Sequence, residues 1–100
     1  MITSLNNNLA KHVIPLVTYT GDASVFENYS AGLSNRSVYE FELFMSTSHP
    51  VLGGGRYLVK GLKFSDPNYE IQQFISYVSN SIKIYYRSKI SGAWGDFIAK

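Results

Sequence analysis

Alternation of apolar and polar side chains is the clearest pattern in the sequence, and it is strongest over residues 38–45. In an extended chain, four apolar residues of this segment share one face: Tyr39, Phe41, Leu43 and Met45. Two glutamates lie between them, so the opposite face is partly polar. The pattern predicts a β-strand that buries one of its two faces.

Similar segments predict further strands at residues 12–19, 56–64 and 82–88. Pro15 confines the first of them to a sheet edge or a bulge, because proline has no N–H to donate to a neighbouring strand. Gly61 lies inside the second and is expected to mark a β-bulge. The regular series of short strands predicts an all-β fold.

Residues 69–78 fit two patterns. Helical spacing relates Ile71, Phe74, Ile75 and Val78. Strand alternation relates Ile71, Gln73, Ile75 and Tyr77. A tight polar turn is expected at residues 79–81, and a short turn between two similar runs favours a β-hairpin. We therefore predict a strand over residues 69–78.

Two polar stretches predict loops between these strands. Residues 25–35 are rich in turn-forming residues and are expected to be mostly loop. Residues 46–55 end in three successive glycines and predict a long loop, which is either flexible or held in unusual backbone conformations. Short strands joined in this way suggest a small antiparallel β-sandwich.

The length and composition indicate one small domain. Residues 1–10 are polar and rich in Asn, which indicates a lead-in or linker, and residues 11–100 form a single β-sandwich domain in this interpretation. Charged residues make up only 16% of the chain, while tyrosine occurs 8 times. A surface low in charge and rich in Tyr, Ser and Asn is typical of contact with another chain or with a carbohydrate.

Several classes of protein do not fit the composition. The net charge of +2 comes from scattered Lys and Arg, so no nucleic-acid partner is expected. No apolar run is long enough to cross a membrane, and the first residues lack a signal-peptide pattern. We therefore expect synthesis in a cytoplasm. Without cysteine the chain has no disulfides, so oligomerisation is the expected source of extra stability.

Catalytic and metal-binding patterns are weak. His12 and His49 are far apart and lack metal-ligand spacing, so no metal site and no cofactor are expected. Residues 53–55 lack the flanking residues of a phosphate-binding loop. Glu40 and Glu42 share one face of a strand, which indicates a solvated side, although they are also the carboxylates of a weaker, alternative hydrolase hypothesis. The sequence predicts a protein that is not an enzyme.

The C-terminal segment gathers the candidate binding residues Tyr85, Tyr86, Arg87 and Trp94, with Phe97 close behind. Strand alternation places Tyr85 and Arg87 on one side and Tyr86 on the other. The cluster can stack on sugar rings, or it can close the core of the domain. We expect Trp94 and Phe97 to be buried, and Tyr85 or Tyr86 to be exposed.

The same region resembles a known family in three segments of roughly the final third of the chain. They are Tyr69-Glu-Ile-Gln-Gln-Phe74, Ile84-Tyr-Tyr-Arg-Ser88 and Gly92-Ala-Trp-Gly-Asp-Phe97. A strand carrying Gln, a strand ending in Tyr-Arg, and a glycine turn before Trp-Gly-x-aromatic are similar to the C-terminal modules of phage tail fibres and tailspikes. The pyocin-knob type of receptor-binding tip is the nearest comparison. Family members often end in Trp-x-x-Trp, whereas the last aromatic residue here is Phe97.

The resemblance implies a β-sandwich that assembles as a homotrimer at the distal end of a fibre. It would attach the virion to a bacterial surface polysaccharide or lipopolysaccharide, after synthesis in the cytoplasm of the bacterial host. Tyr85, Tyr86, Arg87 and Trp94 are the expected ligand-binding residues. The alternative is a structural module that binds no ligand and serves trimerisation, capping or assembly of the fibre.

Overall fold

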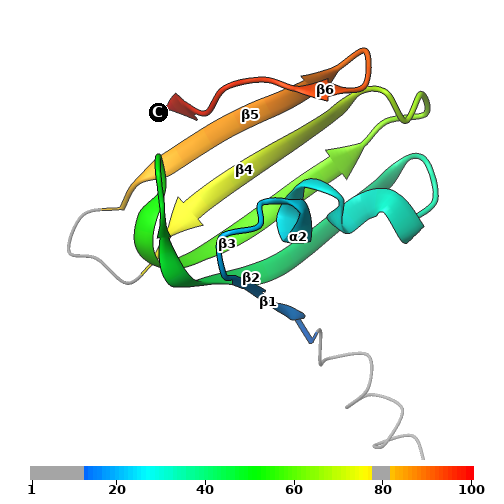
Figure 1. Ribbon diagram of the computed structural model, residues 1–100. Helices are drawn as coiled ribbons and strands as arrows, with labels where there is room; N and C mark the ends of the chain where they lie inside the picture. The colour runs from blue at the N-terminus through cyan, green and yellow to red at the C-terminus, as the bar shows by residue number, and fades with distance from the viewer. Residues whose placement is uncertain (1–12, 78–81) are drawn as a thin grey trace, which may run out of the picture.

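The computed structural model describes residues 13–77 and 82–100, which form one open sheet with a short helical segment on one side (Figure 1). The strands are β1 (Leu16–Tyr19), β2 (Ser37–His49), β3 (Gly53–Lys63), β4 (Glu70–Ser76), β5 (Ile84–Ile90), β6 (Ala93–Trp94) and β7 (Ile98–Ala99). The helical segment consists of α2 (Ser24–Glu27) and the 3-10 helix η1 (Tyr29–Gly32).

The sheet has the order β1-β2-β3-β4-β5-β6, and β7 also pairs with β5. The pairs β2–β3, β3–β4 and β4–β5 are antiparallel, whereas β1 is parallel to β2. The all-β class is confirmed. The described residues form a single mixed sheet, however, and not the two facing antiparallel sheets of the expected sandwich. The chain from β1 to β2 crosses one face of the sheet as helix, so it provides no second sheet.

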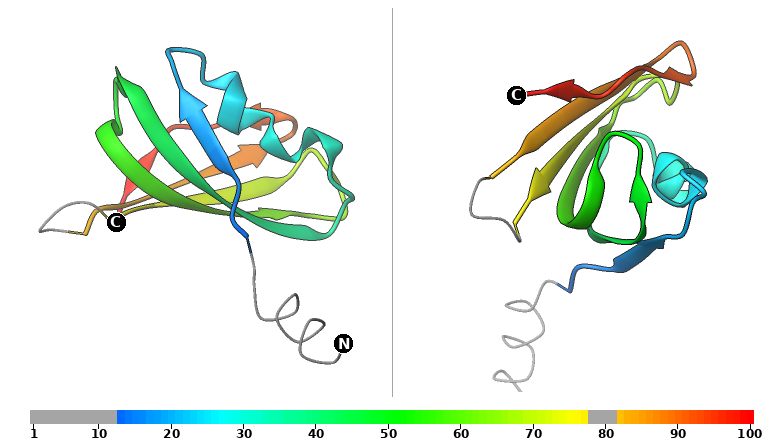
Figure 2. Two further views of the ribbon diagram at one scale, coloured as in Figure 1. Left: turned by 90° about the horizontal axis from the view of Figure 1, so that it is seen from below. Right: turned by 60° about the vertical axis from the view of Figure 1, so that its left-hand side comes forward.

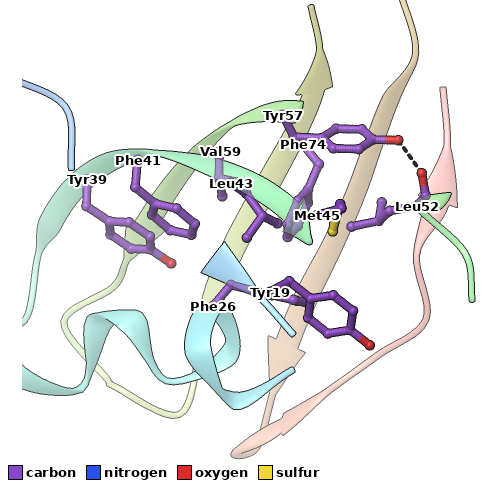
Figure 3. Packing of buried hydrophobic residues seen from close by; sticks show 10 residues of the cluster. All are labelled: Tyr19, Phe26, Tyr39, Phe41, Leu43, Met45, Leu52, Tyr57, Val59 and Phe74. Carbon is purple, nitrogen blue, oxygen red and sulfur yellow. Dashed lines mark hydrogen bonds between the residues drawn. The ribbon is translucent and has the colours of Figure 1, made fainter. Parts of the chain in front are cut away.

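The core lies between the sheet and the helical segment (Figure 2). The apolar alternation of residues 38–45 is confirmed, because Tyr39, Phe41, Leu43 and Met45 are all buried. Their neighbours in the core come from β1, α2, the β2–β3 turn and the two following strands, as Figure 3 shows: Tyr19, Phe26, Leu52, Tyr57, Val59 and Phe74. We call the side of the sheet that bears these residues the covered face.

Two of the expected loops are wrong in their extent. Strand β2 continues to His49 and β3 begins at Gly53, so most of residues 46–55 is strand. The register shifts between Met45 and His49, where the side-chain alternation is lost although the strand continues. Residues 25–35 contain most of α2 and all of η1, which are too short to produce a periodic pattern.

Other expectations of local structure are confirmed where the structure describes them. Residues 69–78 were expected to be a strand, and β4 occupies this segment from Glu70 to Ser76. Strand β1 lies at the edge of the sheet directly after Pro15. His12 and the turn expected at residues 79–81 lie outside the described residues.

Gly61 does not mark a bulge. It pairs with Tyr39 on β2 and with Gln72 on β4 in continuous register. A Cβ atom at this position would lie 1.9 Å from Cζ of Tyr39, so the tyrosine ring occupies the space above the glycine. The missing side chain therefore allows Tyr39 to lie flat on the sheet.

Replacement of Gly61 by alanine is expected to destabilise the domain, because the added methyl group overlaps the Tyr39 ring. Overpacking of this kind costs about 1–3 kcal/mol. Urea unfolding of Gly61→Ala measures the loss. Gly32→Ala is the control, because a Cβ atom at Gly32 meets nothing within 4 Å. Equal stability of the two variants would contradict the packing argument.

Candidate functional site

Arg87 is the best-connected residue of the predicted site. It lies on β5 opposite Gln72 on β4, and only 3% of it is exposed. Its Nε and Nη2 atoms donate to Oε1 of Gln72 at 2.9 and 2.7 Å. Nη1 donates to Oε2 of Glu27 on α2 at 3.1 Å. These bonds join β4 and β5 to the helical segment.

Aromatic rings enclose the guanidinium group. Its carbon atom lies 4.2 to 5.5 Å from the centroids of four rings, those of Phe26, Phe74, Trp94 and Phe97. Cations are attracted to the faces of such rings, most strongly where water is excluded. We call Arg87, Gln72, Glu27 and these four rings the Arg87 cluster. Burial lowers the pKa of Arg87 from its ordinary value, and the contact with Glu27 opposes this shift.

A second group of buried polar side chains continues from the Arg87 cluster along the sheet. The carboxylate of Glu70 accepts hydrogen bonds from Ser30 Oγ at 2.8 Å and from the Tyr39 hydroxyl. Lys63 Nζ donates to the carbonyl oxygens of Ser30 and Leu33 at 2.8 and 2.9 Å. Burial is the main cause that raises the pKa of Tyr39. Among the described residues, every buried side-chain nitrogen and oxygen has a hydrogen-bond partner.

The structure separates the residues that the sequence grouped as one site. Arg87 and Tyr85 face the core side of β5, as alternation predicted, and Tyr85 packs near Tyr57 and Phe97. Trp94 is half-buried on the Arg87 guanidinium, and its indole N–H donates to the Glu27 carbonyl oxygen at 3.1 Å. The three residues therefore belong to one internal cluster.

Tyr86 lies on the opposite face of the sheet. It is half-buried there, and its hydroxyl accepts a hydrogen bond from Nε2 of Gln73 at 2.9 Å. The Nζ atom of Lys100 lies 5.9 Å from the centroid of its ring. Tyr86 therefore shares no surface with Arg87 or Trp94. Its role as a ligand contact stays a prediction.

A hollow of about 290 Å³ lies where β2 and β3 meet, near the end of β4. We call it the glycine hollow. Its lining residues are Leu52, Gly53, Gly54, Gly55, Arg56, Tyr57, Ser76 and Lys83. Gly53 and Gly55 have positive φ angles of 72° and 96°, which favour glycine. Tyr85 lies near this hollow, because its ring centroid is 6.4 Å from that of Tyr57.

The sequence interpretation missed the glycine hollow. The three glycines were the available signal, and the unusual backbone conformations expected of them are observed at Gly53 and Gly55, but the segment was assigned to a loop. In the structure they belong to β3, at the point where the register of the β2–β3 pair shifts. Gly54 and Gly55 are exposed, and because glycine has no side chain this exposed surface is backbone. Backbone groups of this kind are a usual source of directional hydrogen bonds to ligands.

The two glutamates of the hydrolase hypothesis lie on β2, on the side of the sheet opposite the core. Glu42 accepts hydrogen bonds from the Tyr77 hydroxyl and from Nη1 of Arg56. These contacts, that of Tyr77 above all, lower the pKa of Glu42. A general acid in glycoside cleavage needs the opposite shift, so the environment of Glu42 does not favour this chemistry.

Among residues 13–77 and 82–100, no three or more His, Asp or Glu side chains come together as a group able to hold a metal ion. No helix within residues 13–77 and 82–100 has the length and apolar character that crossing a membrane requires.

Arg87→Met is expected to destabilise the domain by about 1–3 kcal/mol, because it leaves Gln72 Oε1 without its donors in a buried site. Chemical denaturation measures the change. Arg56→Met is the matched control, because its ion pair with Glu42 is largely exposed to solvent and such pairs contribute little to stability. If Arg87→Met unfolds at the same denaturant concentration as the control, the cluster does not stabilise the fold.

Stability is also expected to depend on His49. Its Nδ1 accepts hydrogen bonds from the N–H groups of Val51 and Leu52, so the neutral ring closes the β2–β3 turn. Burial and the charge of Arg87 lower the pKa of His49 from 6.5, while Glu27 opposes them. The unfolded chain therefore binds the proton more readily than the folded one. The contribution of His49 is complete above pH 6.5 and is lost as the pH falls through 6.5 toward the folded-state pKa.

Urea unfolding at a series of pH values from about 8 to 5 tests this dependence. His49→Asn is the control, because its Oδ1 atom can accept hydrogen bonds in the position of Nδ1 but does not titrate. We expect a flatter profile for the variant over this range. A profile as steep as that of the unsubstituted chain would assign the pH dependence to other groups.

Comparisons of the chain with family models, with curated proteins and with solved structures find no match. The functional argument therefore depends on the geometry described above and on the resemblance of the three C-terminal segments. Two of these segments contain Arg87 and Trp94, which pack directly on each other in the Arg87 cluster. This contact gives a physical reason for the presence of both residues.

Proposed function

We propose that this chain is a non-enzymatic receptor-binding module at the tip of a phage tail fibre or tailspike. It attaches the virion to a bacterium by binding a surface polysaccharide or lipopolysaccharide. The resemblance of the final third of the chain to such modules supports the proposal. The low content of charged residues and the many tyrosines are also typical of surfaces that contact carbohydrates.

The glycine hollow is the observation that carries the proposal. Sugars present hydroxyl groups that both donate and accept hydrogen bonds, and the exposed backbone of residues 53–55 offers both kinds of partner. Ser76 adds a hydroxyl, and Lys83 adds a positive charge that suits the acidic groups of bacterial polysaccharides and lipopolysaccharides. The hollow therefore offers the chemistry that an acidic saccharide requires.

Assembly as a homotrimer is part of the same proposal. A shallow hollow on a small domain gives weak affinity for one saccharide unit. Three linked copies turn the second and third contacts into intramolecular events, which raises the apparent affinity for a repetitive surface. The sequence predicts a sandwich, but the described residues of one chain form a single sheet. The second sheet of a sandwich would have to come from another copy.

The second candidate function is a structural module that folds or caps the fibre without binding a ligand. One observation favours it: Arg87 and Trp94, which carry part of the resemblance, are used inside the domain. Their role is then to close the fold, and the similarity to fibre modules reflects a shared fold rather than a shared ligand. The two candidates differ in whether the isolated, folded protein binds glycans.

Gly54→Leu tests the receptor-binding proposal, because it fills the glycine hollow without steric conflict at the backbone. Gly54 has no positive φ angle, and a Cβ atom there meets nothing within 4 Å. On a glycan array and on whole bacterial cells, we expect the unsubstituted protein to bind and Gly54→Leu to lose about tenfold or more in affinity. The melting temperature should stay close to that of the unsubstituted protein.

Gly32→Leu is the matched control, since its Cβ atom also meets nothing within 4 Å and the position is remote from β3 in the chain. This variant should bind as the unsubstituted protein does. Unchanged binding by Gly54→Leu would exclude the hollow as the contact site. A folded assembly that binds neither the array nor any cell would reject the receptor-binding function and leave the structural candidate.

A further inference from the structure

The β2–β3 turn forms part of the wall of the glycine hollow, and its backbone is held at two points. Leu52 belongs both to this turn and to the lining of the hollow. Its N–H donates to Nδ1 of His49 at 3.1 Å. Its carbonyl oxygen accepts a hydrogen bond from the Tyr57 hydroxyl at 2.6 Å (Figure 3). The peptide groups on both sides of Leu52 are therefore each fixed by a side chain.

His49 makes the wider of these two contacts. Its Nδ1 accepts hydrogen bonds from two successive N–H groups, those of Val51 at 3.0 Å and of Leu52 at 3.1 Å. His49 is also the register partner of Gly53, the first glycine of the hollow. Gly53 and Gly55 hold positive φ angles of 72° and 96°. The wall thus consists of backbone in unusual conformations, directly after a turn that one imidazole ring holds closed.

Only the neutral form of His49 can make both contacts. The nitrogen of a neutral imidazole that carries no hydrogen is an acceptor, whereas both ring nitrogens of the protonated form are donors. Protonation therefore places an N–H donor of the ring opposite the two N–H donors of the turn. Backbone donors that lose their acceptor destabilise the closed turn. Because His49 is half-buried, its protonated ring has a path to water.

Three elements pack rings against the imidazole of His49. They are Tyr19 on β1, Phe26 on α2 and Phe97 before β7, with ring centroids 5.3 to 5.9 Å from that of His49. Tyr19 is the titratable group among these three. The rings shield part of the imidazole from water, and such burial disfavours its charged form.

Two charged groups also act on His49. Burial has the largest effect on its pKa and lowers it from 6.5, the positive charge of Arg87 on β5 lowers it as well, and Glu27 on α2 opposes both. The second anchor of the turn behaves differently, because burial raises the pKa of Tyr57 from 10.0. Of the two side chains that hold Leu52, His49 alone changes its charge in mildly acidic solution.

We propose that His49 is a pH-sensitive switch that controls the glycine hollow. While the ring is neutral, the turn stays closed and the hollow keeps the shape that binds an acidic saccharide. When the ring is protonated, the turn opens and the hollow loses that shape, so the saccharide is released. The saccharide rests on the proposed function, whereas the switch rests on the hydrogen bonds of the turn.

The direction of the pH dependence follows from the lowered pKa of His49. The folded protein keeps the ring neutral at pH 6.5 and above, so binding is complete there and is lost as the pH falls below 6.5 through the folded-state pKa. The coupling is reciprocal. A saccharide that binds only the closed turn therefore lowers the pKa of His49 further.

NMR spectroscopy of the protein without saccharide tests the switch directly, from about pH 8 to pH 4. The ring proton signals of His49 give the pH at which the ring is half protonated. We expect the backbone amide signals of residues 51–55 to shift with the same midpoint, and that of Gly32 on η1 to stay in place. Amides of residues 51–55 that do not move, or that move with another midpoint, overturn the inference. A ring that stays neutral over the whole range also overturns it.

Three variants separate titration from structure. His49→Asn should abolish the shared midpoint, because an asparagine side chain commonly accepts from the N–H groups that follow it but does not titrate. Tyr57→Phe removes the other anchor, so it should displace the signals of residues 51–55 at every pH and leave their pH-dependent shift in place. His12→Gln removes the second histidine of the chain and is the matched control. It should change neither the midpoint nor the shifts.

Binding to dextran sulfate, an acidic polysaccharide whose charge is constant over this range, tests the consequence for the hollow. One pH unit below the NMR midpoint of His49, about one molecule in ten has a neutral ring, so the affinity should be about tenfold lower than at about pH 8. For His49→Asn we expect a change of less than about threefold between the same two conditions. An equal loss in both proteins overturns the inference.

The outcomes separate the switch from the proposed function. No binding of dextran sulfate at about pH 8, or binding that Gly54→Leu leaves unchanged, counts against the hollow as a saccharide site. The NMR midpoints still decide whether His49 controls the shape of the hollow. If the midpoints differ while Gly54→Leu abolishes binding, the switch is overturned and the saccharide site stays in place.

Discussion

The buried guanidinium of Arg87 is the contact on which most of this fold depends. A cation so deeply buried is tolerated only where its hydrogen bonds and charge are satisfied. Gln72 on the adjacent strand and Glu27 on α2 provide these partners, and Trp94 and Phe97 close over the group from the C-terminal segment. One side chain thus fixes β4, α2 and the last residues of the chain relative to one another.

This arrangement determines which face of the sheet the helical segment covers. The chain between β1 and β2 is short, and the buried polar groups hold it on the covered face. Among the residues that the structure describes, nothing is left to cover the other face. A domain of this size has a modest core, so burial of a second apolar face between copies would contribute substantially to its stability.

Sequence patterns predicted the parts of the fold that depend on local alternation. The strand at residues 38–45 and the division of Tyr85 and Arg87 from Tyr86 follow from the two-residue repeat, and both are observed. The burial of Arg87 was not predictable in this way, because Glu27 lies 60 residues away in the chain. The bulge predicted at Gly61 was wrong for a related reason. A glycine is needed at this position because the Tyr39 ring of the neighbouring strand occupies the space of a side chain. The glycine hollow was missed because a run of glycines is compatible with both a loop and an irregular strand.

The position of the glycine hollow links the proposed assembly to the proposed attachment. The hollow lies where β2 turns into β3, at one end of these long strands. If the copies are related by an axis parallel to the strands, every β2–β3 turn points toward the same end of the assembly. The hollows of all copies can then meet one surface together, which is the geometric condition for a gain in avidity. An axis across the strands would send them to opposite ends, and simultaneous binding to one cell surface would be lost. The requirement for multivalent attachment by the proposed homotrimer therefore favours an axis that runs along the strands.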